Sequence, residues 1–135
     1  MIAALSRLRV SGLLAAAGLM LAACVPANAA ELILYTRKGC AYCVLWEREI
    51  GGIYPRTEEA ARAPLRRVRT DQPQASDPVL TPAVTVTPTF VLMDQGREIG
   101  RFSGYTGDLT FWSMLEMLMR RLPPQPQPAR HVVAE

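Results

Sequence analysis

Two cysteines separated by two residues, Cys40-Ala41-Tyr42-Cys43, follow a short apolar run and the break that ends it. The run is residues 31–36 (ELILYT), which is too short for a helix and is typical of a buried strand. Arg37-Lys38-Gly39 breaks the run, and residues 44–50 read as a helix that Gly51-Gly52 ends. The sequence therefore places this CxxC segment at a strand-to-helix junction, at the N-terminus of the first helix.

The rest of the chain predicts a small α/β domain. A strand–helix–strand unit favours a right-handed crossover and a parallel pair of strands. A hairpin then adds two antiparallel strands, so we expect a mixed four-stranded sheet flanked by helices. The further elements expected are a short helix at 57–62 capped by Thr57 and strands at 65–70, 89–93 and 97–102. A last helix, capped by Asp108, is expected to run to about Leu122, and residues 71–86 are expected to form a proline-interrupted loop.

The first 29 residues have the pattern of a secretory signal peptide. Arg7 and Arg9 precede an apolar segment at 13–21, and Ala27-Asn28-Ala29 supplies the small residues that a leader peptidase requires. The apolar segment falls short of the roughly 20 residues that a bilayer-spanning helix needs. We therefore expect cleavage after Ala29 and a soluble periplasmic protein.

A second interpretation concerns Cys24. Leu21-Ala22-Ala23-Cys24 resembles the lipobox of bacterial lipoproteins, which would keep Cys24 and attach a lipid to it. The tether to the first strand would then be about six residues, or ~20 Å, which is short for a domain standing off a membrane. At the other end, residues 123–135 are rich in Pro and Gln and are expected to be disordered, which leaves 31–122 as the folded domain.

Removal of the leader also changes the charge balance. The full chain of 135 residues has a formal net charge of +3, but residues 30–135 carry 13 Lys and Arg against 12 Asp and Glu. A net charge of +1 gives no reason to expect a nucleic-acid partner.

The CxxC segment is suited to thiol chemistry. Backbone N–H groups and the positive end of the helix dipole stabilise a thiolate at a helix N-terminus, so Cys40 is expected to be the exposed nucleophile. Cys43, one turn further on, is expected to be shielded and to resolve a mixed disulfide. Arg37 and Lys38 add positive charge near Cys40 and are expected to favour its thiolate.

Three other interpretations of the pair are weaker. A zinc site needs two further ligands, and the only histidine, His131, lies in the tail. A purely structural disulfide would close a very small loop and constrain the unfolded chain little. A protease-type cysteine needs a histidine within the fold.

A second motif lies about 45 residues after the CxxC segment. Thr87-Pro88 opens the strand at 89–93, and a proline in this place often belongs to a fixed turn, for which a cis bond is one solution. With the CxxC segment, this motif resembles the thioredoxin superfamily across nearly all of 31–122. The resemblance implies a cis Pro88 beside the cysteines, and Thr87 and Tyr42 in a substrate groove. The buried acid of thioredoxins, six residues before the first cysteine, is replaced by Leu34.

Within the superfamily, the chain resembles the SoxS-like periplasmic thioredoxins of bacterial sulfur-oxidation systems. The resemblance implies a reductant that keeps the cysteine of a sulfur-carrier protein active. It rests on Gly39-Cys40-Ala41-Tyr42-Cys43, Trp46, Glu49-Ile50, Ile53-Tyr54-Pro55, Ala63-Pro64-Leu65-Arg66-Arg67-Val68, Thr87-Pro88-Thr89-Phe90-Val91-Leu92, Gly96-Arg97-Glu98-Ile99-Gly100-Arg101 and Gly104-Tyr105.

These observations predict a periplasmic thiol–disulfide oxidoreductase that reduces a protein substrate through Cys40 and Cys43. Because the periplasm is kept oxidising, such a reductase needs a membrane-bound electron donor. We expect a monomer that uses no cofactor and no metal. The alternatives are a disulfide oxidase or isomerase of secreted proteins, and a non-catalytic binding module of the same fold.

Overall fold

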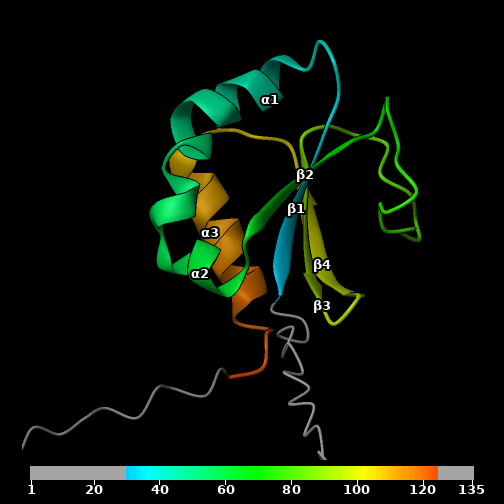
Figure 1. The fold of residues 1–135 in the computed structure, drawn as a ribbon. Coiled ribbons are helices and arrows are strands. Elements are labelled where there is room, and N and C mark those ends of the chain that lie inside the picture. Colours follow the sequence, from blue (N-terminus) through cyan, green and yellow to red (C-terminus); the bar gives the residue numbers. More distant parts are fainter. Residues whose placement is uncertain (1–29, 125–135) are drawn as a thin grey trace, which may run out of the picture.

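The computed structural model describes residues 30–124 and shows one sheet with all its helices on one face (Figure 1). The predicted leader and all but the first two residues of the predicted tail lie outside the described residues. Within these residues, no helix combines the length and the apolar character that crossing a membrane requires. The elements are β1 (Glu31–Thr36), α1 (Ala41–Trp46) with a π-helical turn (Glu47–Gly51), a 3₁₀ turn (Tyr54–Arg56), α2 (Glu58–Arg62), β2 (Leu65–Arg69), β3 (Thr89–Asp94), β4 (Arg97–Ser103) and α3 (Asp108–Met119).

The strand order is β2-β1-β3-β4, which confirms the predicted mixed sheet. β1 runs parallel to β2 and antiparallel to β3. A central strand is covered on both faces, and accordingly Leu32, Ile33 and Leu34 are completely buried. The carboxyl end of β1 therefore has a fixed position, and the segment with the two cysteines starts from it.

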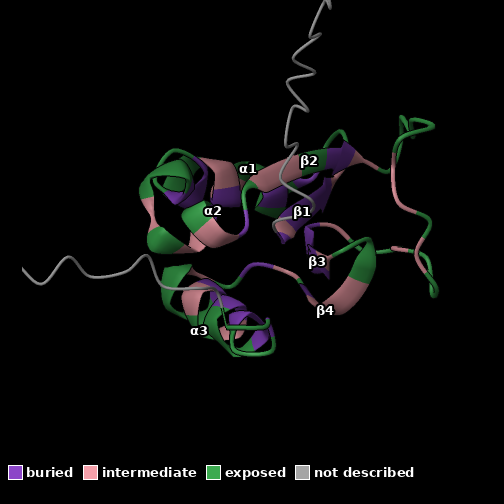
Figure 2. Ribbon diagram, turned by 60° about the horizontal axis from the view of Figure 1, so that its bottom comes forward, coloured by how far each residue is buried: buried purple, intermediate pink, exposed green. Residues whose placement is uncertain are grey.

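An aromatic core joins the helices to their face of the sheet. The Trp46 ring lies 5.3 Å from the Phe90 ring and 5.5 Å from the Phe111 ring, measured between centroids. Phe111 of α3 also packs edge-on against Phe90 of β3, 5.0 Å away. Such contacts contribute about 1 kcal/mol each beyond the area they bury. They hold α1 and α3 against the sheet, and Figure 2 shows the buried residues on the facing sides of the two layers.

The other face of the sheet has no helix and is covered by residues 71–86, which contain neither helix nor strand. Leu80 and Val84 of this segment pack on a second apolar cluster. Arg66 donates to the Ser76 carbonyl, and Arg101 donates to the Pro82 carbonyl, which attaches the segment to both edge strands. The second cluster consists of Ile33, Tyr35, Val68, Val91 and Met93.

Two details differ from the predicted last helix. Gly107, rather than Asp108, occupies the N-cap position of α3, with a φ of 125° that favours glycine. Asp108 is the first helical residue, and its carboxylate accepts a hydrogen bond from the Leu109 N–H at 2.7 Å. The helix ends at Met119 instead of near Leu122, because the chain turns at Arg120 and Arg121. The predicted cap at Thr57 is confirmed: its hydroxyl accepts from the Ala60 N–H.

Gly100 of β4 allows α3 to approach the sheet. A Cβ atom at this position would lie 2.7 Å from Cδ2 of the buried Leu118. We expect Gly100→Ala to lower the free energy of unfolding by about 1–2 kcal/mol. Alanine reduces the conformational entropy of the unfolded chain, which favours folding, but the overpacking against Leu118 costs more free energy than this provides. Urea unfolding measures the change.

Gly52→Ala is the matched control for this substitution. Gly52 has an α-helical φ of −81° and open space around it, so the same change should be neutral or slightly stabilising. Equal effects of the two substitutions would contradict the close contact between β4 and α3.

Candidate functional site

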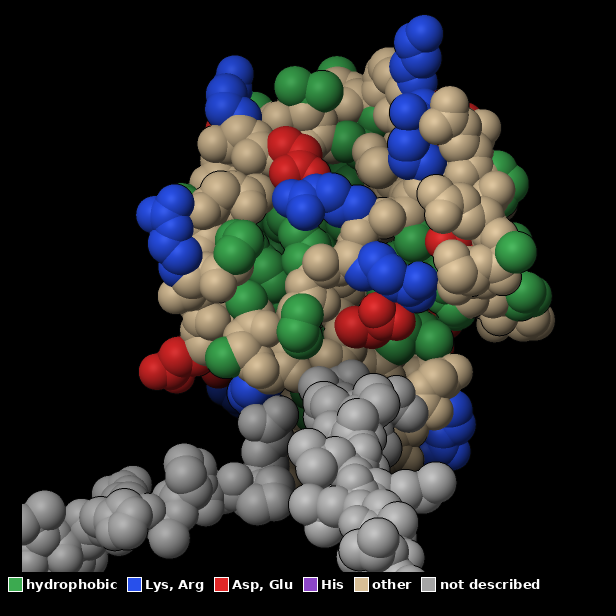
Figure 3. Space-filling model, viewed as in Figure 1, with side chains coloured by type: hydrophobic (Ala, Val, Ile, Leu, Met, Phe, Trp, Pro, Cys, Tyr) green, Lys and Arg blue, Asp and Glu red, His purple; other side chains and the backbone are tan. Residues whose placement is uncertain are grey.

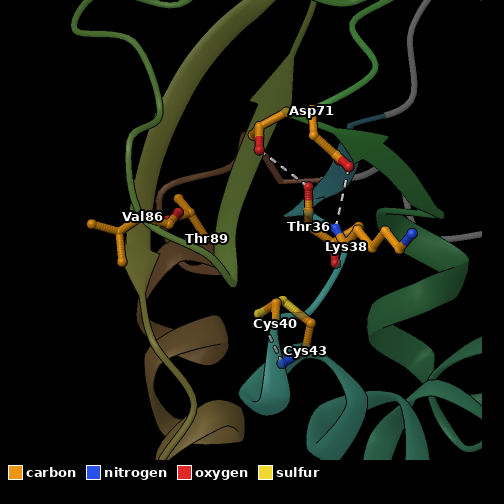
Figure 4. Close-up of a disulfide and its surroundings, with 8 residues drawn as sticks. Thr36, Lys38, Cys40, Cys43, Asp71, Val86 and Thr89 are labelled. Carbon is orange, nitrogen blue, oxygen red and sulfur yellow. Dashed lines mark hydrogen bonds between the residues drawn. A yellow bond between two sulfur atoms is a disulfide. The ribbon is translucent and has the colours of Figure 1, made fainter.

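The two cysteines lie where β1 passes into α1, as the sequence predicts. Gly39 adopts a φ of 76°, and Cys40 follows as the N-cap residue of α1 with an extended backbone. Its sulfur accepts a hydrogen bond from the Cys43 N–H at 3.2 Å. Cys40 and Cys43 form a disulfide with a Cα–Cα distance of 5.2 Å, shown with its surroundings in Figure 4.

Both cysteines are less accessible than the sequence suggests. Cys40 is 7% exposed and Cys43 is 4% exposed, although Cys40 was expected to be the exposed member of the pair. In the oxidised form the two sulfurs are bonded and each covers part of the other's surface. What sets Cys40 apart is therefore its N-cap position and the N–H group that points at its sulfur.

A groove of about 370 Å³ runs along one side of the disulfide. Arg37 and Lys38, which the sequence singles out, line it together with both cysteines. Its other lining residues come from the end of β1, from α1 and from the end of β2. They are Thr36, Gly39, Val44, Glu47 and Arg69.

Sequence reasoning did not identify Glu47 and Arg69 as groove residues. Glu47 follows Cys43 by four residues, so helical spacing places it on the same side of α1. Arg69 ends β2, and the carboxyl ends of neighbouring parallel strands lie at one edge of the sheet. Both signals were present in the sequence, but using the second required knowing that β1 and β2 pair.

Each carboxylate near the groove is paired with an arginine. Arg67 holds Glu47 through two hydrogen bonds, of 2.6 and 2.8 Å. Arg69 binds Asp71 and keeps the pKa of that carboxyl below its ordinary value. Asp71 also accepts the Lys38 backbone N–H at 3.4 Å, which connects the segment after β2 to the turn before Cys40.

The segment before β3 contains Thr87 and Pro88, which the sequence also singles out. The Thr87–Pro88 peptide bond is cis, as the resemblance implies, and Pro88 is buried. The Pro88 carbonyl accepts the Gly104 N–H at 2.7 Å. Tyr42 stands on α1 with 61% of its surface exposed. None of these residues lines the groove that contains Arg37 and Lys38.

Tyr105 connects the helix of the cysteines to the loop beside Pro88. Its hydroxyl donates to Oε2 of Glu49 in the π-helical turn, at 2.7 Å, and its neighbour Gly104 bonds to Pro88. Burial, with a further contribution from the Glu49 bond, raises the pKa of Tyr105 to about 12. The bond thus joins the π-helical turn after α1 to the loop beside Pro88.

Among residues 30–124, no three side chains of His, Cys, Asp or Glu come together as metal ligands. His131 and Cys24 lie outside this range.

The Tyr105 hydroxyl predicts a loss of stability in alkali. An ordinary tyrosine has a pKa of 10.0, so between about pH 10 and pH 12 the unfolded chain releases a proton that the fold retains. The free energy of unfolding then falls as pH rises. We expect Tyr105→Phe to cost about 1–2 kcal/mol at pH 8 and to flatten this alkaline decline.

Urea unfolding of both proteins at several values between pH 8 and pH 11 measures the two effects. A decline equally steep in Tyr105→Phe would contradict the raised pKa of the Tyr105 hydroxyl.

Comparison with known proteins agrees with the geometry. No protein-family model matches the chain, and none of the curated proteins matches it. Among solved structures, the reduced periplasmic thioredoxin SoxS from Paracoccus pantotrophus is 38% identical, with 68% of this chain and 97% of that chain covered and a TM-score of 0.59.

More distant similarities concern the fold alone. Fasciola hepatica thioredoxin is 22% identical, over 69% of this chain and 81% of that chain, with a TM-score of 0.51. Chlamydomonas reinhardtii thioredoxin f2 is 14% identical, over 75% of this chain and 86% of that chain, with a TM-score of 0.53. The CxxC disulfide at the start of α1, the mixed sheet and the match to SoxS together lead to one conclusion: the chain belongs to the thioredoxin superfamily of thiol–disulfide oxidoreductases.

Proposed function

We propose that the protein is a periplasmic reductase of protein disulfides, with Cys40 as the nucleophile and Cys43 as the resolving thiol. The observation that carries the proposal is the Cys40–Cys43 disulfide at the N-terminus of α1, with the Cys43 N–H directed at the Cys40 sulfur. That N–H is a ready donor to a Cys40 thiolate once the disulfide is reduced.

The first step is attack of the Cys40 thiolate on one sulfur of a partner disulfide. A bond forms between Cys40 and that sulfur, and the partner's disulfide bond breaks. The other partner sulfur leaves as a thiolate and takes a proton from water. Cys40, rather than Cys43, suits this step because its sulfur caps the helix, whereas Cys43 lies inside the first turn.

In the second step, Cys43 as a thiolate attacks the Cys40 sulfur. The mixed disulfide breaks, the partner's second thiol is released, and the Cys40–Cys43 disulfide forms. The partner has gained two electrons and the enzyme has lost two, so another dithiol must reduce the enzyme before the next cycle. In an oxidising periplasm, a membrane-bound protein is the donor that meets this requirement.

Thr87, Pro88 and Tyr42 are proposed to hold the partner segment. Thr87 is half-buried just before the buried Pro88, and Tyr42 is exposed on the CxxC helix. Arg37 and Lys38 lie in the groove with Cys40 and are proposed to favour its thiolate, by a small amount because both side chains are exposed.

The location and the partner rest on the leader and on the SoxS similarity. Residues 1–29 have the pattern of a secretory signal, with Cys24 as the alternative lipid site, and the protein that is 38% identical is described as periplasmic. The cysteine of a sulfur-carrier protein, held in a disulfide, is accordingly our proposed substrate, within the broader class of protein disulfides.

Replacing Cys43 by Ser tests the assignment of the two sulfurs. The first step remains possible, but the mixed disulfide on Cys40 is no longer resolved. We expect Cys43→Ser to accumulate disulfide-linked partners in periplasmic extract, visible as reductant-sensitive bands on non-reducing gels and identified by mass spectrometry.

Cys40→Ser is the matched control, because it leaves the less accessible Cys43 as the single thiol. It should capture little. Equal capture by the two variants would overturn the assignment, and no capture by Cys43→Ser would favour a binding module without catalysis.

A further inference from the structure

The groove beside the disulfide has an unbalanced positive charge. Its acidic residue, Glu47, is held by Arg67, and its cation Arg69 is held by Asp71. Arg37 and Lys38 remain: both are exposed, and neither forms an ion pair with any residue that the structure describes. Two cations at the entrance to the cysteines are therefore available to a partner.

This charge is local. Residues 30–124 contain 12 Lys and Arg against 11 Asp and Glu, a net charge of +1. The groove residues alone carry a net charge of +2, so the remainder of the described domain is slightly negative. Figure 3 shows basic side chains along the upper edge, where β1 passes into α1, and acidic and basic side chains in contact lower down. An acidic partner would be attracted to this edge and not to the molecule as a whole.

Exposure limits what the two cations can do for Cys40 itself. Water and salt screen charges at the surface, with a Debye length of about 8 Å at physiological ionic strength. An exposed charge therefore changes the stability of a neighbouring thiolate only slightly. The same charges are far more effective on encounter, where a local field raises the association rate of an oppositely charged partner by tenfold or more.

The groove also has an apolar component. Val44, the residue after Cys43, is 67% exposed and lines the groove. It offers a contact for an apolar side chain of the partner, while Arg37 and Lys38 stand at the β1 end of the groove.

We propose that the groove selects disulfides that lie in an acidic segment, with Arg37 and Lys38 as its specificity-determining residues. The inference rests on the proposed reductase function and names the class of its substrate. The partner is a protein segment in which Asp or Glu residues flank the disulfide-bonded cysteine whose sulfur Cys40 attacks.

Three synthetic peptides test the proposal. Each contains the same disulfide, flanked by Glu, by Gln or by Lys. The reduced protein is mixed with each peptide, and the second-order rate constant of disulfide exchange is measured at ionic strengths of ~20 mM and ~500 mM. We expect the Glu peptide to react about tenfold faster than the Lys peptide at low ionic strength, and the difference to fall to about twofold or less at high ionic strength.

The double variant Arg37→Gln, Lys38→Gln identifies the source of the preference. It should remove most of the difference between the Glu and Lys peptides. Arg97→Gln is the matched control, because Arg97 is an exposed cation at the opposite end of the sheet, where it lies opposite Asp94 in the register of the hairpin. It should retain the full preference.

The pH profile of Cys40 alkylation by iodoacetamide separates selection from thiolate tuning. Selection predicts a profile that moves by less than about 0.3 pH unit in the double variant, since exposed charges act weakly on Cys40. A larger shift of the alkylation profile, together with an equal loss of exchange rate for all three peptides, would overturn the proposal. It would show that the two cations act on the Cys40 thiolate and not on the partner. Equal rates for the three peptides with the unmodified protein would overturn it while leaving the reductase intact. If even the Gln peptide is not reduced, the reductase function fails, and the inference fails with it.

Discussion

The burial of β1 on both faces is the constraint on which the site depends. Leu32, Ile33 and Leu34 are completely buried between the aromatic core on one face and residues 71–86 on the other. Burying such side chains contributes about 2 kcal/mol each, so this strand cannot shift along its neighbours without a large loss. Its carboxyl end therefore presents Gly39 and Cys40 at a fixed place. The helix that starts there brings the sulfur of Cys43 within bonding distance of the Cys40 sulfur, which the redox chemistry requires.

The charges around the disulfide divide into two groups. Glu47 and Asp71 are each bound by an arginine, and the Glu47–Arg67 pair connects the π-helical turn after α1 to β2. Arg37 and Lys38, in contrast, make no ion pair within residues 30–124. The first group shapes the groove, and the second is available for recognition. This division agrees with the rule that exposed charges contribute little to stability but much to the rate and specificity of encounter.

Local signals predicted much of this structure. The apolar run of β1, the CxxC junction and the Thr57 cap each depend on neighbouring residues, and each is confirmed. The cis bond at Pro88 came from family resemblance, since a sequence only permits it. The Glu47–Arg67 and Glu49–Tyr105 bonds could not be predicted, because they join residues 20 and 56 positions apart. The cover of the second sheet face was also missed, since Leu80 and Val84 belong to a segment with no apolar periodicity.

The reduction potential of the Cys40–Cys43 couple tests the central claim most directly. The protein is equilibrated with dithiothreitol or glutathione buffers that have a defined ratio of reduced to oxidised form. The oxidised fraction of the protein is then measured by thiol alkylation and intact mass. A reductase requires a disulfide that is stable relative to those of its substrates, so the account predicts a value near that of thioredoxin, about −270 mV. A value near about −120 mV would mark the pair as a strong oxidant and would contradict the proposed direction of electron flow.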